Sequence, residues 1–183
     1  MTVADLLADA FGRIREEVHA AVDGLSADDL AYRPDPESNS VGWLIWHLLR
    51  VADDHLADAA GTGQVWTEEG WADRFGLALD PADTGYGHGP GQVVLVTVAS
   101  AGLLTGYCDA VIQRASEYVR GLSGPDLDRI VDTRWDPPVT LGVRLISVIS
   151  DDLQHAGQAA YLRGLLRLSP QPATPPAGRP FSR

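Results

Sequence analysis

Apolar residues recur at helical spacing through the first sixty positions of the chain. The first series, at steps of three or four residues, consists of Leu7, Phe11, Ile14, Val18 and Val22. With the capping pattern at Thr2 and Asp5, this period predicts an amphipathic helix that ends near Gly24. A second long helix is predicted over about residues 41–60, because the apolar period returns there and stops at the glycines within residues 61–63.

The rest of the chain is predicted to contain two connections and two more helices. Residues 61–90 are rich in glycine, yet their aromatic side chains favour an ordered crossover over a loose loop. These aromatic residues are Trp66, Trp71, Phe75 and Tyr86. The apolar period over about residues 92–120 predicts a third long helix, although residues 93–98 alone also fit a strand. A connection over residues 121–138 then leads to a last helix over about residues 141–168.

Four long helices without a convincing strand predict an all-α fold, a four-helix bundle in one domain over residues 1–168. A helix of 20 residues is about 30 Å long, and a 30-residue connection at about 3.3 Å per residue can retrace that length. The second and third helices can therefore run parallel, which predicts an up-down-down-up arrangement. The proline-rich segment 169–183 is predicted to be a disordered tail.

Composition and charge exclude several classes of function. Fourteen basic residues against twenty-five acidic ones give a net charge of −11, which would repel nucleic acid and anionic membrane. Every basic residue is an arginine, so Schiff-base, pyridoxal-phosphate and Walker A chemistry lack their lysine. With Cys108 as the single cysteine, any metal must be held by His, Asp or Glu. No membrane-length apolar run or basic leader is present, and we expect a cytoplasmic protein.

Polar residues interrupt the apolar stripes of two predicted helices. Asp151 and His155 lie four residues apart on one face of the last helix, and His47 lies between apolar neighbours on the helix over residues 41–60. A carboxylate aimed at a core costs several kcal/mol unless it is paired or binds metal. If the two helices face each other, these three residues form a two-His-one-carboxylate metal site with open positions. The alternative for His47 is a hydrogen-bonded core histidine. The same spacing joins His19 and Asp23, which we interpret as a solvated surface pair.

Two segments carry a resemblance to a known superfamily. The segment SVGWLIWHL at residues 40–48 is similar to the helix 2 motif, and DDLQHAGQ at residues 151–158 is similar to the His-x-Gly-Gln helix 4 motif, of the DinB/YfiT-like metal-binding four-helix bundles. The resemblance covers about residues 2–168. Many members have a histidine where Asp151 stands. The carboxylate instead resembles the mycothiol-dependent branch, which includes maleylpyruvate isomerase and mycothiol S-transferases and uses two His and one Glu.

This resemblance implies a divalent-metal-dependent thiol transferase or isomerase. The open metal site would hold a low-molecular-weight thiol such as mycothiol as metal-bound thiolate and direct it at a small electrophile. Zinc is the first choice of metal, with nickel or iron as alternatives, and the resemblance also implies a homodimer. The alternative functions are a metal-dependent hydrolase and a non-enzymatic bundle that binds a metal or a small molecule.

Residues near the predicted ligands are candidates for supporting roles. His55 and Asp54 follow His47 by two turns and are candidate proton acceptors, with a solvated surface pair as the alternative. Asp152 is a candidate to hydrogen-bond and orient a metal ligand, or to be the carboxylate ligand itself in place of Asp151. Gln158, one turn after the ligand histidine of the last helix, is a further candidate to orient a ligand.

Candidate substrate contacts are less specific. Arg144 and Arg163 can bind acidic groups on the thiol or the substrate, although arginine is the only cation of this chain and a surface role is the alternative. Trp66 and Trp71 can wall the mouth of the pocket or anchor the crossover. Cys108 is interpreted as a small core residue rather than a reactive thiol.

Overall fold

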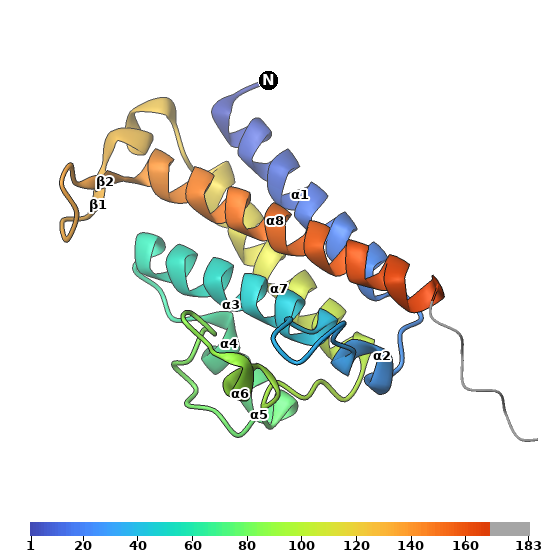
Figure 1. Ribbon diagram of the computed structural model, residues 1–183. Coiled ribbons are helices and arrows are strands. Elements are labelled where there is room, and N and C mark those ends of the chain that lie inside the picture. Colours follow the sequence, from blue (N-terminus) through green and yellow to red (C-terminus); the bar gives the residue numbers. More distant parts are fainter. Residues whose placement is uncertain (169–183) are drawn as a thin grey trace, which may run out of the picture.

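Four long helices run along the molecule in the computed structural model, which describes residues 1–168 (Figure 1). They are α1 (Val3–Val22), α3 (Val41–Ala60), α7 (Ala101–Arg120) and α8 (Leu141–Leu168). The shorter elements are α2 (Ala27–Ala31), α4 (Val65–Glu68), α5 (Trp71–Phe75), α6 (Pro90–Val93), the 3₁₀ helix η1 (Gly124–Asp128), β1 (Ile130–Asp132) and β2 (Val139–Thr140). The predicted all-α bundle is confirmed. The predicted tail over residues 169–183 lies outside the described residues.

The long helices pack in the predicted up-down-down-up arrangement. Helices α1 and α3 each pack against both α7 and α8, so that α1 and α3 occupy opposite corners of the bundle. Arg50 of α3 contacts Tyr107 of α7, and Ala59 further along α3 contacts Tyr118 further along α7, so these helices run parallel. Helix α8 runs antiparallel to α3, since His47 of α3 meets His155 of α8, whereas His55, further along α3, meets Arg144, further back in α8.

Local signals start α1 and α3, and end α3, where the sequence predicts. Thr2 and Asp5 form the capping box of α1, and the Ser40 hydroxyl accepts a hydrogen bond from the amide of Trp43 at the start of α3. Helix α3 ends at Gly61, whose φ of 68° lies in the left-handed region that glycine adopts without strain. None of the described helices has the length and hydropathy needed to cross a bilayer.

Two expectations from the sequence are wrong. The third long helix begins at Ala101 rather than near residue 92, because α6 stops at Val93 and the next residues form turns. Val96 and Val98 are nevertheless buried, and Val98 packs against Gly42, so an irregular segment that fills the core imitates a helical period. The absence of strands is also wrong, because β1 and β2 form a short antiparallel hairpin. Strands of two or three residues are too short to show an alternating pattern.

The crossover between α3 and α7 is ordered and packs against the bundle, as its aromatic residues predict. Trp66, Trp71 and Phe75 gather around the buried ring of Tyr107 on α7, at ring-centroid distances of 5.2, 5.7 and 6.0 Å. Tyr86 is the exception, with 91% of its surface exposed. Figure 1 shows the crossover helices beside α3 and the β1–β2 hairpin at one end of the bundle.

Candidate metal centre

Facing positions of α3 and α8 bring together the three residues that the sequence predicts to converge. His47, Asp151 and His155 each offer one ligand atom, and these atoms lie within 4.8 Å of one another. The rings of the two histidines meet edge to face with centroids 5.0 Å apart, and Nε2 of His155 lies 3.6 Å from Oδ1 of Asp151. A divalent metal ion can be held by this cluster.

Hydrogen bonds on the far side of each imidazole orient both rings. Nδ1 of His47 lies 2.5 Å from the carbonyl oxygen of Thr84, which can only accept, so Nδ1 carries the proton and Nε2 keeps its lone pair. Nδ1 of His155 donates to Oε1 of Gln158 at 2.9 Å with the same result. Burial lowers the pKa of His47, which favours the neutral ring that a metal requires. Partners of this kind commonly orient histidine ligands.

The donor set fits a divalent transition metal. Oδ2 of Asp151 is buried and has no hydrogen-bond partner among residues 1–168. Leaving such an oxygen unpaired is costly in a folded protein, and a cation would satisfy it. Two imidazole nitrogens and one carboxylate oxygen suit zinc, nickel or iron and leave coordination positions for a further group.

Asp152 lies outside this cluster. It is fully buried, and within the described part of the chain neither of its carboxylate oxygens has a hydrogen-bond partner. Burial, and secondarily the charge of Asp151, raises the pKa of Asp152 well above its usual value, which favours the protonated form. Neighbouring residues of a helix project about 100° apart, so only one of these two aspartates can face His47.

A cavity of about 680 Å³ opens beside the cluster, and His47 and Asp151 form part of its wall. The other lining residues are Val51, Asp54, His55, Thr84, Tyr86, Asp132, Arg134, Trp135, Arg144, Ser147 and Val148. They come from α3, from the crossover, from the β1–β2 hairpin and from the first turns of α8. The cluster therefore lies at the wall of a space large enough for a small-molecule reactant.

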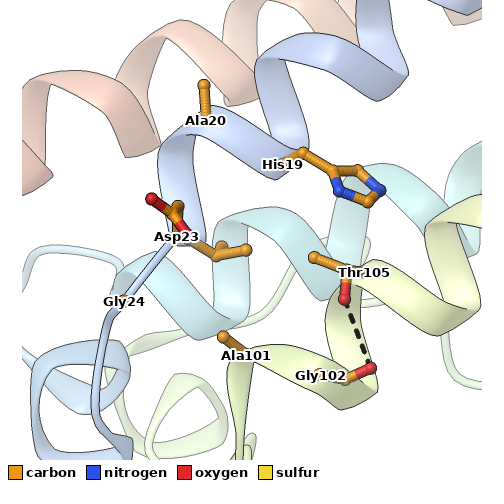
Figure 2. A pocket seen from close by; sticks show the side chains of 8 residues that line it. His19, Ala20, Asp23, Gly24, Ala101, Gly102 and Thr105 are labelled. Atoms are coloured by element: carbon orange, nitrogen blue, oxygen red, sulfur yellow. Dashed lines mark hydrogen bonds between the residues drawn. The ribbon is translucent and has the colours of Figure 1, made fainter.

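A second cavity, of about 480 Å³, lies between the end of α1 and the start of α7 (Figure 2). His19 points into it from α1, and Thr105 bonds back to the carbonyl of Gly102 on α7. Nε2 of His19 pairs with Asp109 of α7 at 2.8 Å, so this histidine bridges two helices instead of pairing with Asp23. Among residues 1–168, the candidate metal ligands His47, Asp151 and His155 lie outside this second cavity. The residues that line it form no other cluster of His, Cys, Asp or Glu that could hold a metal ion.

Comparison with known proteins shows the family of the chain. The model of the mycothiol S-transferase family matches residues 6–167. The chain belongs to the mycothiol S-transferase family. A solved structure, described as the conserved protein of a locus from Enterococcus faecalis, is similar with 30% sequence identity and a TM-score of 0.85, covering 92% of this chain and 99% of that one. No curated protein matches the chain.

Several of the other residues predicted for this mycothiol S-transferase family member line the cavity. Asp54, His55 and Arg144 are among them, and Nη1 of Arg144 lies 3.2 Å from Nδ1 of His55. Since a guanidinium only donates, this contact requires an unprotonated nitrogen on His55. Burial, and then the charge of Arg144, lowers the pKa of His55 in the same direction.

Three predicted substrate contacts lie elsewhere. Arg163 donates to the carbonyl of Ala21 in α1 and is not part of the cavity wall. Trp66 and Trp71 are buried against Tyr107, which corresponds to the alternative that they anchor the crossover. Cys108 is fully buried in the core, as expected, and burial raises the pKa of its thiol well above the usual value.

A buried network that the sequence analysis missed fastens the crossover in place. Arg50 is fully buried, and its guanidinium donates to the carbonyls of Pro81 and Asp83 at 3.3 Å each. The Asp53 carboxylate accepts from the amides of Val65 and Trp66. The sequence did carry a signal for this network, because Arg50 interrupts an otherwise apolar stretch of α3. This network holds the main chain just before Thr84, whose carbonyl orients His47.

A second contact that was missed holds the crossover over the metal-ligand cluster. The indole nitrogen of Trp43 donates to Nδ1 of His88, whose Nε2 in turn donates to the Asp83 carboxylate at 2.9 Å. The indole of Trp43 also stacks on the ring of His47 with centroids 4.5 Å apart. The crossover therefore bonds to the same indole that packs against His47.

Proposed function

We propose that this protein is a divalent-metal-dependent thiol S-transferase, with His47, Asp151 and His155 as metal ligands and zinc as the first choice of metal. The observation that supports it is the convergence of His47 and His155, each oriented by a hydrogen bond at Nδ1, with the Asp151 carboxylate, which has a buried unpartnered oxygen, beside a cavity. Membership of the mycothiol S-transferase family supports mycothiol as the thiol. The family match also favours transfer over the hydrolase and non-enzymatic alternatives.

The single cysteine of the chain is not accessible as a nucleophile. Cys108 is fully buried, and burial raises the pKa of its thiol, which leaves it inert. Thiol transfer by this protein therefore needs an external thiol as its nucleophile. A divalent ion held by the three ligands would supply the positive charge that lowers the pKa of such a thiol.

Residues of the cavity wall handle the proton and the geometry of the reaction. His55 has an unprotonated nitrogen, and Asp54 lies 3.8 Å from the same ring. Asp54, or His55 in exchange for its hydrogen bond from Arg144, can take the thiol proton while the sulfur forms a bond to the electrophilic carbon, whose leaving group departs with its electron pair. Tyr86 and Trp135 add aromatic surface to the same wall.

Metal content is the direct test of the ligand set. Protein purified without a metal-affinity tag should contain about one transition-metal ion per chain by elemental analysis. His47→Ala and His155→Ala should lower this value well below one, whereas the matched control His19→Ala should retain it. Unchanged metal in both ligand variants would refute the site. Loss in Asp152→Asn but not in Asp151→Asn would move the carboxylate ligand by one residue.

Turnover tests the reaction itself. Metal-loaded protein should accelerate the addition of mycothiol to monobromobimane, and His55→Gln should slow it while leaving the metal content intact. If thiol addition is not accelerated at full metal occupancy while an ester or amide is cleaved, hydrolysis replaces transfer.

A further inference from the structure

Two arginines share one buried carboxylate in the cavity beside the metal-ligand cluster, at the end where the β1–β2 hairpin forms the wall. Asp132 of β1 accepts from Nε and Nη2 of Arg134 at 3.0 and 2.8 Å, and from Nη2 of Arg144 at 2.8 Å. Only 3% of the Asp132 side chain is exposed. One carboxylate facing two guanidinium groups leaves one guanidinium charge of this trio without a hydrogen-bonded carboxylate of its own.

The guanidinium groups keep donors that no other residue uses. Nη1 of Arg134 and Nε of Arg144 make no hydrogen bond with the part of the chain that the structure describes. The Arg134 side chain is 81% exposed, so its free edge is open to solvent, whereas Arg144 is 13% exposed and is held in place. A planar guanidinium edge of this kind binds a carboxylate with two parallel hydrogen bonds.

The charge of the whole cavity depends on the metal ion. Among the described residues, three carboxylates and two guanidinium groups line it, which leaves one excess negative charge when the histidines are neutral. A divalent cation at the ligand cluster would reverse this sign. The cavity of the metal-loaded protein is therefore expected to accept an anion that the metal-free cavity repels.

We propose that Arg134, supported by Arg144 and Asp132, binds the carboxylate of a reactant within this cavity. The proposal rests on the proposed function for its metal-loaded state and names the chemistry of one reactant. That reactant is the electrophile if the thiol is mycothiol, whose cysteine carboxyl is in an amide bond, and it is the thiol only if an acidic thiol takes the place of mycothiol. Trp135 follows Arg134 in the hairpin, is 67% exposed, and provides an aromatic surface beside the bound carboxylate.

Binding of a simple probe tests the subsite without any turnover. Zinc-loaded protein is titrated calorimetrically at low salt with succinate and with the uncharged analogue succinamide. Succinate should bind more tightly, and Arg134→Gln should weaken succinate binding about tenfold, which corresponds to about 1.4 kcal/mol. Arg134→Lys should restore part of the loss. The matched control Arg13→Gln removes another exposed arginine that pairs with an aspartate outside the cavity, and it should have no effect. Equal binding of succinate by wild-type protein and Arg134→Gln, as when the metal ion alone holds the carboxylate, would overturn the proposal.

Two pairs of reactants identify the source of the carboxylate. Iodoacetate is compared with iodoacetamide at a fixed neutral thiol, and 3-mercaptopropionate with its amide at a fixed neutral electrophile. Arg134→Gln should lower kcat/KM for the charged member of one pair only, and that pair names the reactant. Turnover that is independent of Arg134 in both pairs would overturn the proposal. Absence of turnover together with succinate binding that depends on Arg134 would support the subsite while refuting the thiol-transferase function.

Discussion

Gly85 offers a sharp test of how the crossover supports the metal centre. Its φ of 85° is in the left-handed region, and a Cβ placed on it would lie 2.9 Å from Nδ1 of His47 and 2.9 Å from the ring of Trp46. The preceding carbonyl, that of Thr84, is the hydrogen-bond acceptor for His47. No side-chain substitution can remove a carbonyl, but Gly85→Ala would displace it.

Gly85→Ala should lower the free energy of unfolding for two separable reasons. A left-handed conformation costs an alanine roughly 1–2 kcal/mol, and the added methyl group in a packed site costs about 1–3 kcal/mol more. Gly87→Ala is the matched control, because Gly87 has a φ of 75° but a Cβ there meets no atom within 4 Å. Gly87→Ala should therefore lower the free energy of unfolding by the backbone cost alone, whereas Gly85→Ala should lower it by the backbone cost and the steric cost together.

Metal affinity separates a local clash from general destabilisation. Loss of the partner that orients a histidine ligand typically weakens metal binding by about 10–100-fold. Competition for zinc against a chromophoric chelator should show this loss for Gly85→Ala and not for Gly87→Ala, and urea unfolding gives the stability of each variant. Equal stability losses in the two variants, or unchanged zinc affinity in Gly85→Ala, would refute the role assigned to the Thr84 carbonyl.

Three further predictions concern the core and the cavity. Arg50→Met removes one member of a buried charge pair and should lower the free energy of unfolding by about 3–5 kcal/mol in urea, whereas Arg13→Met at an exposed pair should leave it nearly unchanged. Cys108 should resist a thiol reagent in the native protein at pH 8 and react fully after unfolding, and rapid labelling of the native state would contradict its burial. Because burial and Arg144 lower the pKa of His55 below its usual 6.5, the stabilisation linked to this group is present above that value and is lost as the pH falls. The metal-free protein should therefore be less stable at pH 5.5 than at pH 7.5, and an undiminished slope in His55→Gln would contradict this origin.

The long helices and the ligand cluster were predictable because their signals are local. Apolar residues repeat along each helix at its own period, and a capping residue stands beside the boundary it sets, as Ser40 does for α3. His47, Asp151 and His155 could be found for the same reason, since each interrupts an apolar stripe, although their convergence required that the two helices face each other.

Segments without their own period were misjudged. Residues 94–100 place Val96 and Val98 in the core from an irregular main chain, and their spacing resembles that of the helix that follows. The β1–β2 hairpin forms through pairing of residues about ten positions apart, such as Ile130 with Thr140, and its strands are too short to show a pattern.

The sequence by itself thus determined the helices and the identity of the candidate ligands, while the tertiary structure decided what surrounds them. The carbonyl that orients His47 belongs to Thr84, and a main-chain atom has no signature in the side-chain sequence. The pairing of Arg134 with Arg144 across Asp132 depends on how a hairpin closes over the start of α8. Such contacts join residues that share no helix face, so only the packed chain brings them together.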